Sequence, residues 1–186
     1  MSDQIKFESV DYNPFREAEI LKVSGLVDAQ KEIWLACKIG GKEANLSYNE
    51  SISLILEGIL NEEHLSQACK ILSERHEALK MVFAPNGIKY MVTDQANVPF
   101  LFLDWTEADR IERDFRLAHF LEKEVDTEFD LQNGPLARFT LIKLEDNIHH
   151  FTITAHHLVC DGWSFGILFE ELASIYYSLF EGIPFN

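Results

Sequence analysis

The chain has 186 residues, of which 47% are hydrophobic and 14 are phenylalanine, so it is long and apolar enough to bury the core of one domain. Its formal net charge of -15 would repel a phosphate backbone, which argues against a nucleic-acid-binding protein. No apolar stretch approaches the ~20 residues of a membrane helix, so no membrane partner is expected. Three widely spaced cysteines form no disulfide or metal pattern, which favours a reducing cytoplasm and no metal site.

The first part of the chain mixes charged residues with Asn-Pro and Gly. Residues 1–26 are therefore interpreted as a leader or linker, and residues 27–186 as one domain without an internal boundary. A helix is expected to begin at Asp28, and Gly40-Gly41 is expected to end it. Ile- and Leu-rich alternation then predicts a strand over residues 49–59.

Helices and hairpins alternate through the rest of the chain. Asn61 is suited to cap a helix whose apolar residues repeat at helical spacing, and Thr106 is suited to cap a longer helix that runs to about residue 127. The remaining predicted elements are a hairpin over 79–83 and 88–92, a short buried strand over 100–103, a loop over 133–135, a hairpin over 137–144 and 148–156, and an amphipathic helix over 165–180. Strands interleaved with helices predict an α/β (α+β) sandwich with a mixed, partly antiparallel sheet.

The segment from His156 to Gly162 carries the strongest functional signal. Side chains alternate across a strand, so His156 and His157 should point to opposite faces. His157 continues the apolar row of the strand and emerges at its end, where partial desolvation would keep the ring neutral and able to accept a proton. His156 is better placed for a structural hydrogen bond. The sequence therefore predicts His157 as the candidate general base.

Other functions of the same segment remain open at this point. Asp161 precedes a helix and is an ordinary N-cap type, and Gly162 either forms the turn or allows a substrate to approach the backbone. Cys160 is a candidate nucleophile, although a cysteine among apolar residues is more often core filler. His149 and His150 are expected at the surface of a hairpin, too far from the second pair of histidines to share a metal ion.

Two arginines are candidate partners for the Asp161 carboxylate. Arg75 lies at a helix end, where it could equally be a solvated basic residue that complements the helix dipole. Arg138 lies within a predicted strand and competes for the same role.

Three ordered strings resemble the condensation domains of non-ribosomal peptide synthetases. His156 to Ser164 resembles the H-H-x-x-x-D-G-W-S signature of that family. Arg75 to Lys80, followed by Phe83, resembles its R-H-E-x-L-R-x-x-F string, with Lys80 in place of the second Arg. Ala29-Gln30 with Trp34 is similar to its early A-Q-x-x-x-W string. The resemblance runs from about residue 26 to the end of the chain.

The resemblance implies a chloramphenicol acetyltransferase-like fold and a reaction that forms an amide. The donor thioester and the acceptor amine would each be carried by the phosphopantetheine arm of a peptidyl or acyl carrier protein, with an adenylation domain in the same assembly line and no directly bound cofactor. His157 would be the catalytic residue. His156 would support it, Asp161 would hold the loop by pairing with Arg75 or Arg138, and Gly162 would leave room beside the thioester.

Members of that family are more than twice as long, with two similar lobes and an active site in the tunnel between them. The chain therefore resembles the N-terminal lobe alone, and the isolated lobe is expected to be inactive and to self-associate through the surface where the second lobe docks. Two alternatives are a stand-alone acyltransferase of the same superfamily that uses an acyl-CoA donor, and an inactive fragment that binds carrier proteins.

Overall fold

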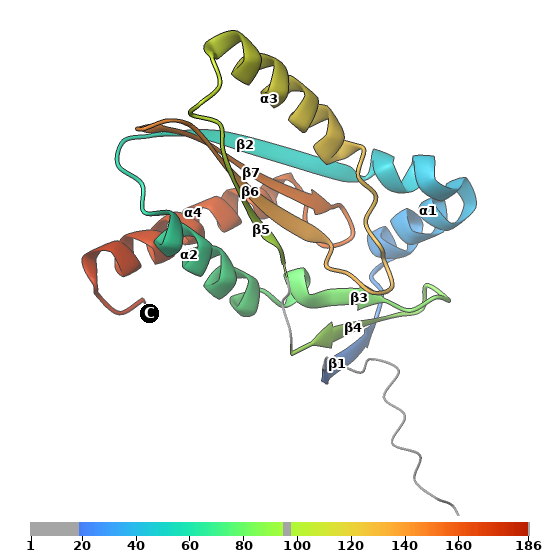
Figure 1. Cartoon of the computed structure of the whole chain (residues 1–186). Coiled ribbons are helices and arrows are strands. Elements are labelled where there is room, and N and C mark those ends of the chain that lie inside the picture. The colour runs from blue at the N-terminus through green and yellow to red at the C-terminus, as the bar shows by residue number, and fades with distance from the viewer. Residues whose placement is uncertain (1–18, 95–97, 186) are drawn as a thin grey trace, which may run out of the picture.

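The computed structural model describes residues 19–94 and 98–185, whose strands form two sheets (Figure 1). The larger sheet has the order β2-β7-β6-β5, with β2 at Asn49–Glu57, β7 at Ile148–His156, β6 at Ala137–Glu145 and β5 at Phe100–Asp104. The smaller sheet has the order β1-β4-β3, with β1 at Ile20–Gly25, β4 at Lys89–Thr93 and β3 at Met81–Phe83. β5 pairs parallel with β6 and the other pairs are antiparallel, which confirms the expected mixed sheet.

Helices pack on the larger sheet from both sides (Figure 1). The described helices are α1 at Asp28–Ser47, α2 at Glu62–Arg75, α3 at Arg110–Val125 and α4 at Gly162–Glu181, with a short 3-10 turn, η1, at Glu77–Lys80. α2 and α4 lie side by side and cover the face that carries Phe151 and Ile153, where the main core forms. α3 contacts the opposite face, which carries Thr152 and Thr154. No helix in the described part of the chain combines the length and apolar character needed to cross a membrane.

β7 is the central strand that positions the segment from His156 to Gly162, the signature segment. It pairs with β2 from Asn49↔His156 to Glu57↔Ile148, and with β6 on its other side. His149 and His150 are therefore only 2% and 5% exposed, so the expectation of surface hairpin residues was wrong. Burial lowers the pKa of both rings. Because β7 has paired strands on both edges and helices on both faces, its first histidines are covered and do not reach solvent.

Several predicted boundaries were correct and others were not. Asn61 caps α2, because its side-chain oxygen accepts a hydrogen bond from the His64 backbone N–H at 3.0 Å. Thr106 does not cap α3; Asp109 does, by accepting from the Glu112 N–H at 2.9 Å, while Thr106 bonds to Asp104 in the preceding turn. β5 is an edge strand with Leu101 48% exposed, and not the buried strand that its apolar sequence predicted.

The prediction of a leader over residues 1–26 is wrong at its C-terminal end. Residues 20–25 form β1, which pairs antiparallel with β4 at the edge of the smaller sheet. The strand was missed because most of its residues are exposed, so burial imposes little pattern on its sequence. Residues 1–18 lie outside the described part of the chain.

The glycine pair at residues 40 and 41 bends α1 without ending it. Gly41 has φ 63° and ψ -145°, which interrupts the helix, and the chain resumes helical geometry as far as Ser47. That backbone conformation is accessible almost only to glycine. The continued helix brings Asn45 to the segment that precedes β6, where its side chain donates to the Phe129 carbonyl at 3.2 Å.

Candidate functional site

The signature segment crosses from the end of β7 to the start of α4. β7 ends at His156, the chain turns over residues 157–159, and α4 begins at Gly162. The His157 N–H donates to the Tyr48 carbonyl at 2.9 Å, which continues the β2 pairing one residue beyond the strand. The Val159 N–H donates to the His156 carbonyl at 3.0 Å and closes the turn. The backbone thus fixes where each of the two histidines points.

His156 is fully buried and belongs to the scaffold. Its Nδ1 accepts a hydrogen bond from the Leu158 N–H at 3.2 Å, and its Nε2 lies 3.9 Å from Cys37 Sγ. The Tyr48 and Phe129 rings pack around it. Burial lowers the pKa of His156 to about 4. The ring is therefore neutral at pH 7, and an acceptor at Nδ1 leaves the ring proton on Nε2.

His157 lies on the opposite side and reaches solvent. Its side chain is 37% exposed, and its Nε2 lies 3.2 Å from Oε2 of Glu50, whose side chain is 31% exposed. The expected apolar surroundings are therefore absent, because a carboxylate from β2 occupies the position next to the ring. No local sequence pattern predicts Glu50 at this site, since the register that pairs β2 with β7 is set by the tertiary structure.

Asp161 caps α4 and makes no ion pair with either candidate arginine. Its Oδ1 accepts from the Ser164 hydroxyl at 2.6 Å and from the Ser164 backbone N–H at 2.9 Å. These two hydrogen bonds lower the pKa of the Asp161 carboxyl. Gly162 follows as the first residue of α4, and a Cβ at this position would meet no atom within 4 Å. The space beside Gly162 is open.

Both arginines are engaged elsewhere, which corrects the expected pairing with Asp161. Arg75 Nε lies 3.1 Å from Oε2 of Glu171, which is ten residues and about 15 Å further along α4 than Asp161. Arg138 Nε lies 2.6 Å from Oε2 of Glu124 on α3. Their positions follow from packing: α2 lies against the middle of α4, and Arg138 points to the sheet face that α3 contacts.

The thiols near the segment are poor nucleophiles. Burial raises the pKa of Cys160 to about 12, and burial also raises the pKa of Cys37. A thiol that remains protonated at neutral pH reacts slowly, so Cys160 is core filler. Among residues 19–94 and 98–185, no group of three or more His, Cys, Asp or Glu side chains is arranged to hold a metal ion.

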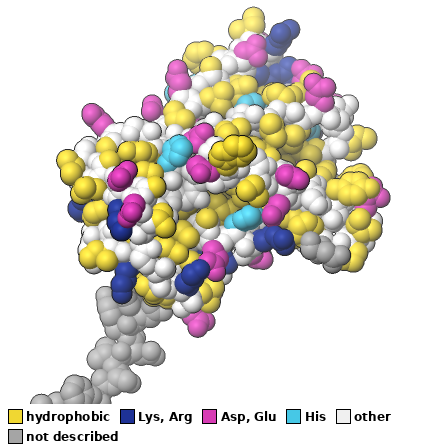
Figure 2. Space-filling view, turned by 180° about the vertical axis from the view of Figure 1, so that it is seen from behind, with side chains coloured by type: hydrophobic (Ala, Val, Ile, Leu, Met, Phe, Trp, Pro, Cys, Tyr) yellow, Lys and Arg dark blue, Asp and Glu magenta, His cyan; other side chains and the backbone are white. Residues whose placement is uncertain are grey.

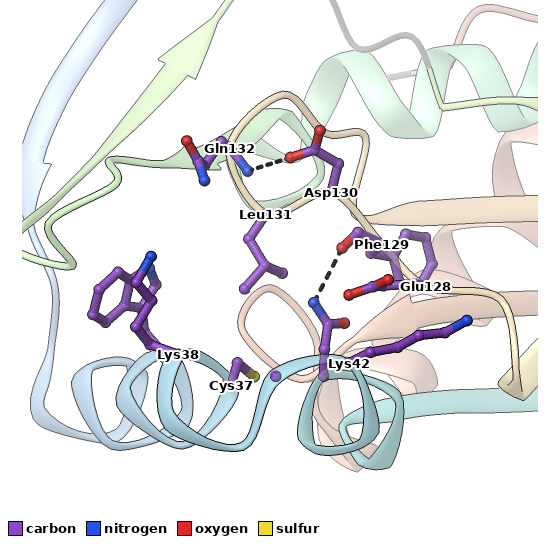
Figure 3. A pocket seen from close by; sticks show the side chains of 11 residues that line it. Cys37, Lys38, Lys42, Glu128, Phe129, Asp130, Leu131 and Gln132 are labelled. Carbon is purple, nitrogen blue, oxygen red and sulfur yellow. Dashed lines mark hydrogen bonds between the residues drawn. The ribbon is translucent and has the colours of Figure 1, made fainter.

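Two hollows lie beside the segment. One, of about 540 Å³, separates α1 from the 128–132 segment (Figure 3). Cys37, Lys38 and Lys42 line it from α1, and Cys37 also contacts His156, so this hollow lies on the scaffold side. A smaller apolar cavity of about 120 Å³ lies between η1 and α4 and is lined in part by Cys160, Ser164 and Ile167.

The sequence model of the family described as "Condensation domain" matches residues 21–186. The chain is 32% identical over 160 residues to malpinin synthetase of Mortierella alpina, an alignment that covers 83% of the chain and 2% of the relative. It is 34% identical over 166 residues to tyrocidine synthase 3 of Brevibacillus parabrevis, covering 88% and 2%. It is 32% identical over 169 residues to surfactin synthase subunit 2 of Bacillus subtilis, covering 91% and 4%.

Solved structures share the fold. The starter condensation domain of rhizomide synthetase superposes with a TM-score of 0.79 at 22% identity, covering 88% of this chain and 41% of that one. The first condensation domain of the calcium-dependent antibiotic synthetase, in complex with a substrate analogue, gives a TM-score of 0.77 at 22% identity, covering 88% and 39%. The chain thus spans about two fifths of these solved domains and 2–4% of the curated relatives.

Proposed function

This chain belongs to the condensation-domain family, and from that premise we propose that it forms the N-terminal lobe of a domain that makes amide bonds. The donor is an acyl or peptidyl thioester on one carrier protein, and the acceptor is an aminoacyl group on another. The phosphopantetheine arms of the carriers deliver both substrates. An adenylation domain of the same cytoplasmic assembly line loads the acceptor. The second lobe of the domain completes the tunnel around His157.

The observation that carries the proposal is the exposed ring of His157 at the end of the central strand. With 37% of the side chain open and its backbone fixed by Tyr48, the ring is accessible on a rigid support. The acceptor nitrogen attacks the thioester carbonyl carbon, a C–N bond forms and the C–S bond breaks. His157 accepts the proton that the amine loses, and this proton then passes to the departing thiolate of the donor arm.

The neighbouring residues have supporting roles in this proposal. Asp161 fixes the start of α4 through its two hydrogen bonds with Ser164, and Gly162 leaves open space where the thioester approaches. His156 is neutral and buried, and it holds the turn through the Leu158 N–H. Arg75 and Arg138 act at longer range, by fixing α2 against α4 and α3 against the sheet.

The test measures amide formation from an acylated carrier protein and an aminoacylated carrier protein. The chain is assayed alone and with the C-terminal lobe of a related condensation domain supplied in trans. We expect turnover only in the mixture, since the chain spans about two fifths of solved condensation domains. The change His157→Ala should abolish it, whereas His119→Ala, at an exposed histidine on α3, should not. Turnover that survives His157→Ala would overturn the assignment.

Two further outcomes would replace the proposal. Transfer from an acyl-CoA by the chain alone would identify a stand-alone acyltransferase. Carrier binding without turnover in any combination would identify an inactive docking fragment.

A further inference from the structure

Glu50 and His157 are diagonal neighbours across the β2–β7 pair. Glu50 pairs with Ala155 in the antiparallel register, and His157 is two residues beyond Ala155 on the same face. Diagonal positions of an antiparallel pair are about 7–8 Å apart at Cα, a gap that a glutamate and a histidine side chain can bridge. The two groups meet with Glu50 Oε2 3.2 Å from His157 Nε2.

The Glu50 carboxylate has no other role that the structure displays. Its Oε2 atom is buried, although the side chain as a whole is 31% exposed, and it has no hydrogen-bond partner among the described residues. A buried carboxylate oxygen without a donor is costly, and the ring of His157, 3.2 Å away, is the group whose positive charge would offset this cost. The contact therefore ties the ring of His157 to β2.

We propose that Glu50 is a positioning residue for His157, an inference that rests on the proposed function of His157 as the base. The contact with Glu50 holds the ring of His157 in one orientation toward the amine. Once the ring has accepted the proton of the amine it is a cation, and the adjacent carboxylate stabilises it. A carboxylate that orients a catalytic imidazole and stabilises its charged form is an established arrangement in hydrolases.

The other titratable groups around His157 do not place a negative charge in contact with its ring. His156 on β7 is neutral at pH 7, because burial lowers its pKa to about 4. Cys160, in the turn, stays protonated because its pKa is raised to about 12. Asp161, before α4, is anionic and interacts with His157 through its charge, but its Oδ1 is already bonded to Ser164. Glu50 is thus the anion in direct contact with the ring.

The test uses Glu50→Gln, which keeps the shape and removes the charge, with Glu57→Gln as its matched control. Glu57 is at the other end of the same strand, about 23 Å from Glu50. An NMR spectrum of the ¹⁵N-histidine-labelled chain follows the ring of His157. We expect Glu50→Gln to move the ring resonances of His157, because the ring loses the carboxylate 3.2 Å from its Nε2. Glu57→Gln should leave those resonances unchanged.

The same variants enter the condensation assay with the second lobe supplied. Glu50→Gln should lower kcat by about 10-fold and leave KM within about two-fold. Unchanged ring resonances of His157 in Glu50→Gln, or equal kcat values, would overturn the inference. If Glu50→Gln moves the ring resonances but the wild type makes no amide, the proposed function is refuted and the Glu50–His157 contact stands.

Discussion

The Nε atom of Arg138 lies 2.6 Å from the Oε2 atom of Glu124, and the two side chains are only 14% and 11% exposed. The Thr154 hydroxyl donates to the same carboxylate oxygen at 2.8 Å, and the guanidinium carbon lies 4.4 Å from the centre of the Phe129 ring. This cluster joins α3, β6 and β7 beneath the segment that carries His156. It fixes the frame of the site without touching the proposed base.

Arg138→Ala should destabilise the chain strongly, because the nearly buried Glu124 carboxylate loses the guanidinium that balances its charge. We expect a loss of about 3 kcal/mol in the free energy of unfolding, measured by urea denaturation. The control is Arg116→Ala, which breaks an exposed pair with Glu112 and should cost under about 0.5 kcal/mol. Similar losses in the two variants would show that burial of the Arg138 pair is unimportant.

Asp161→Ala should weaken the start of α4, because the Ser164 N–H loses its acceptor. We expect a loss of about 1 kcal/mol in the free energy of unfolding. Asp161→Asn retains a capping oxygen, so its free energy of unfolding should stay within about 0.3 kcal/mol of the wild type. Chemical denaturation monitors both variants. An alanine variant as stable as the asparagine variant would exclude a capping role.

Acidification should destabilise the fold through His156. Its pKa is about 4 in the folded chain against an ordinary value of 6.5, so the unfolded chain binds more protons between these two values. The contribution of His156 is complete above about pH 6.5 and declines as the pH falls toward 4, with a loss on the order of 2 kcal/mol by pH 5. Denaturation at pH 7 and pH 5 measures the total change, to which the buried His149 and His150 also contribute.

Site-resolved NMR assigns the share of His156, because its ring should stay neutral in the native chain down to pH 5. A His156 ring that titrates near 6.5 would contradict the expectation.

Two glycine substitutions should have opposite effects. Gly41→Ala should cost about 1–3 kcal/mol, because φ 63° with ψ -145° is a conformation that alanine rarely adopts. Gly166→Ala, at an exposed position inside α4 with no atom within 4 Å of the added Cβ, should stabilise the chain by about 0.5–1 kcal/mol. Thermal denaturation compares the two variants directly, and a neutral Gly41→Ala would argue against the bend in α1.

The isolated chain should self-associate through exposed apolar side chains. Trp163 is 87% exposed and Ile167 is 53% exposed on the first turns of α4, and hydrophobic side chains are spread among acidic ones over the face shown in Figure 2. Sedimentation over a range of concentrations should detect association, and Trp163→Glu should reduce it. The matched change Phe115→Glu, at a 75% exposed position on α3, tests whether association is specific to α4. A monomer at all concentrations would refute the prediction.

Local sequence signals predicted most of the elements. Asn61 predicted the start of α2, and the two predicted hairpins appear as β3–β4 and β6–β7, because capping and strand alternation depend on near neighbours in the chain. The separation of His156 and His157 onto opposite sides also followed from alternation alone. β1 escaped detection, since an exposed edge strand needs no apolar pattern.

The charge partners were decided by the tertiary structure. Glu50 reaches His157 only because β2 pairs with β7 in one particular register, and Arg75 meets Glu171 because α2 lies against the middle of α4. The sequence by itself determined which residues carry the family signature and which face of the strand each occupies, because these depend on residue order and a two-residue repeat. It could not determine the partners of those residues, because ion pairs form between segments brought together by sheet register and helix packing, which no local pattern encodes.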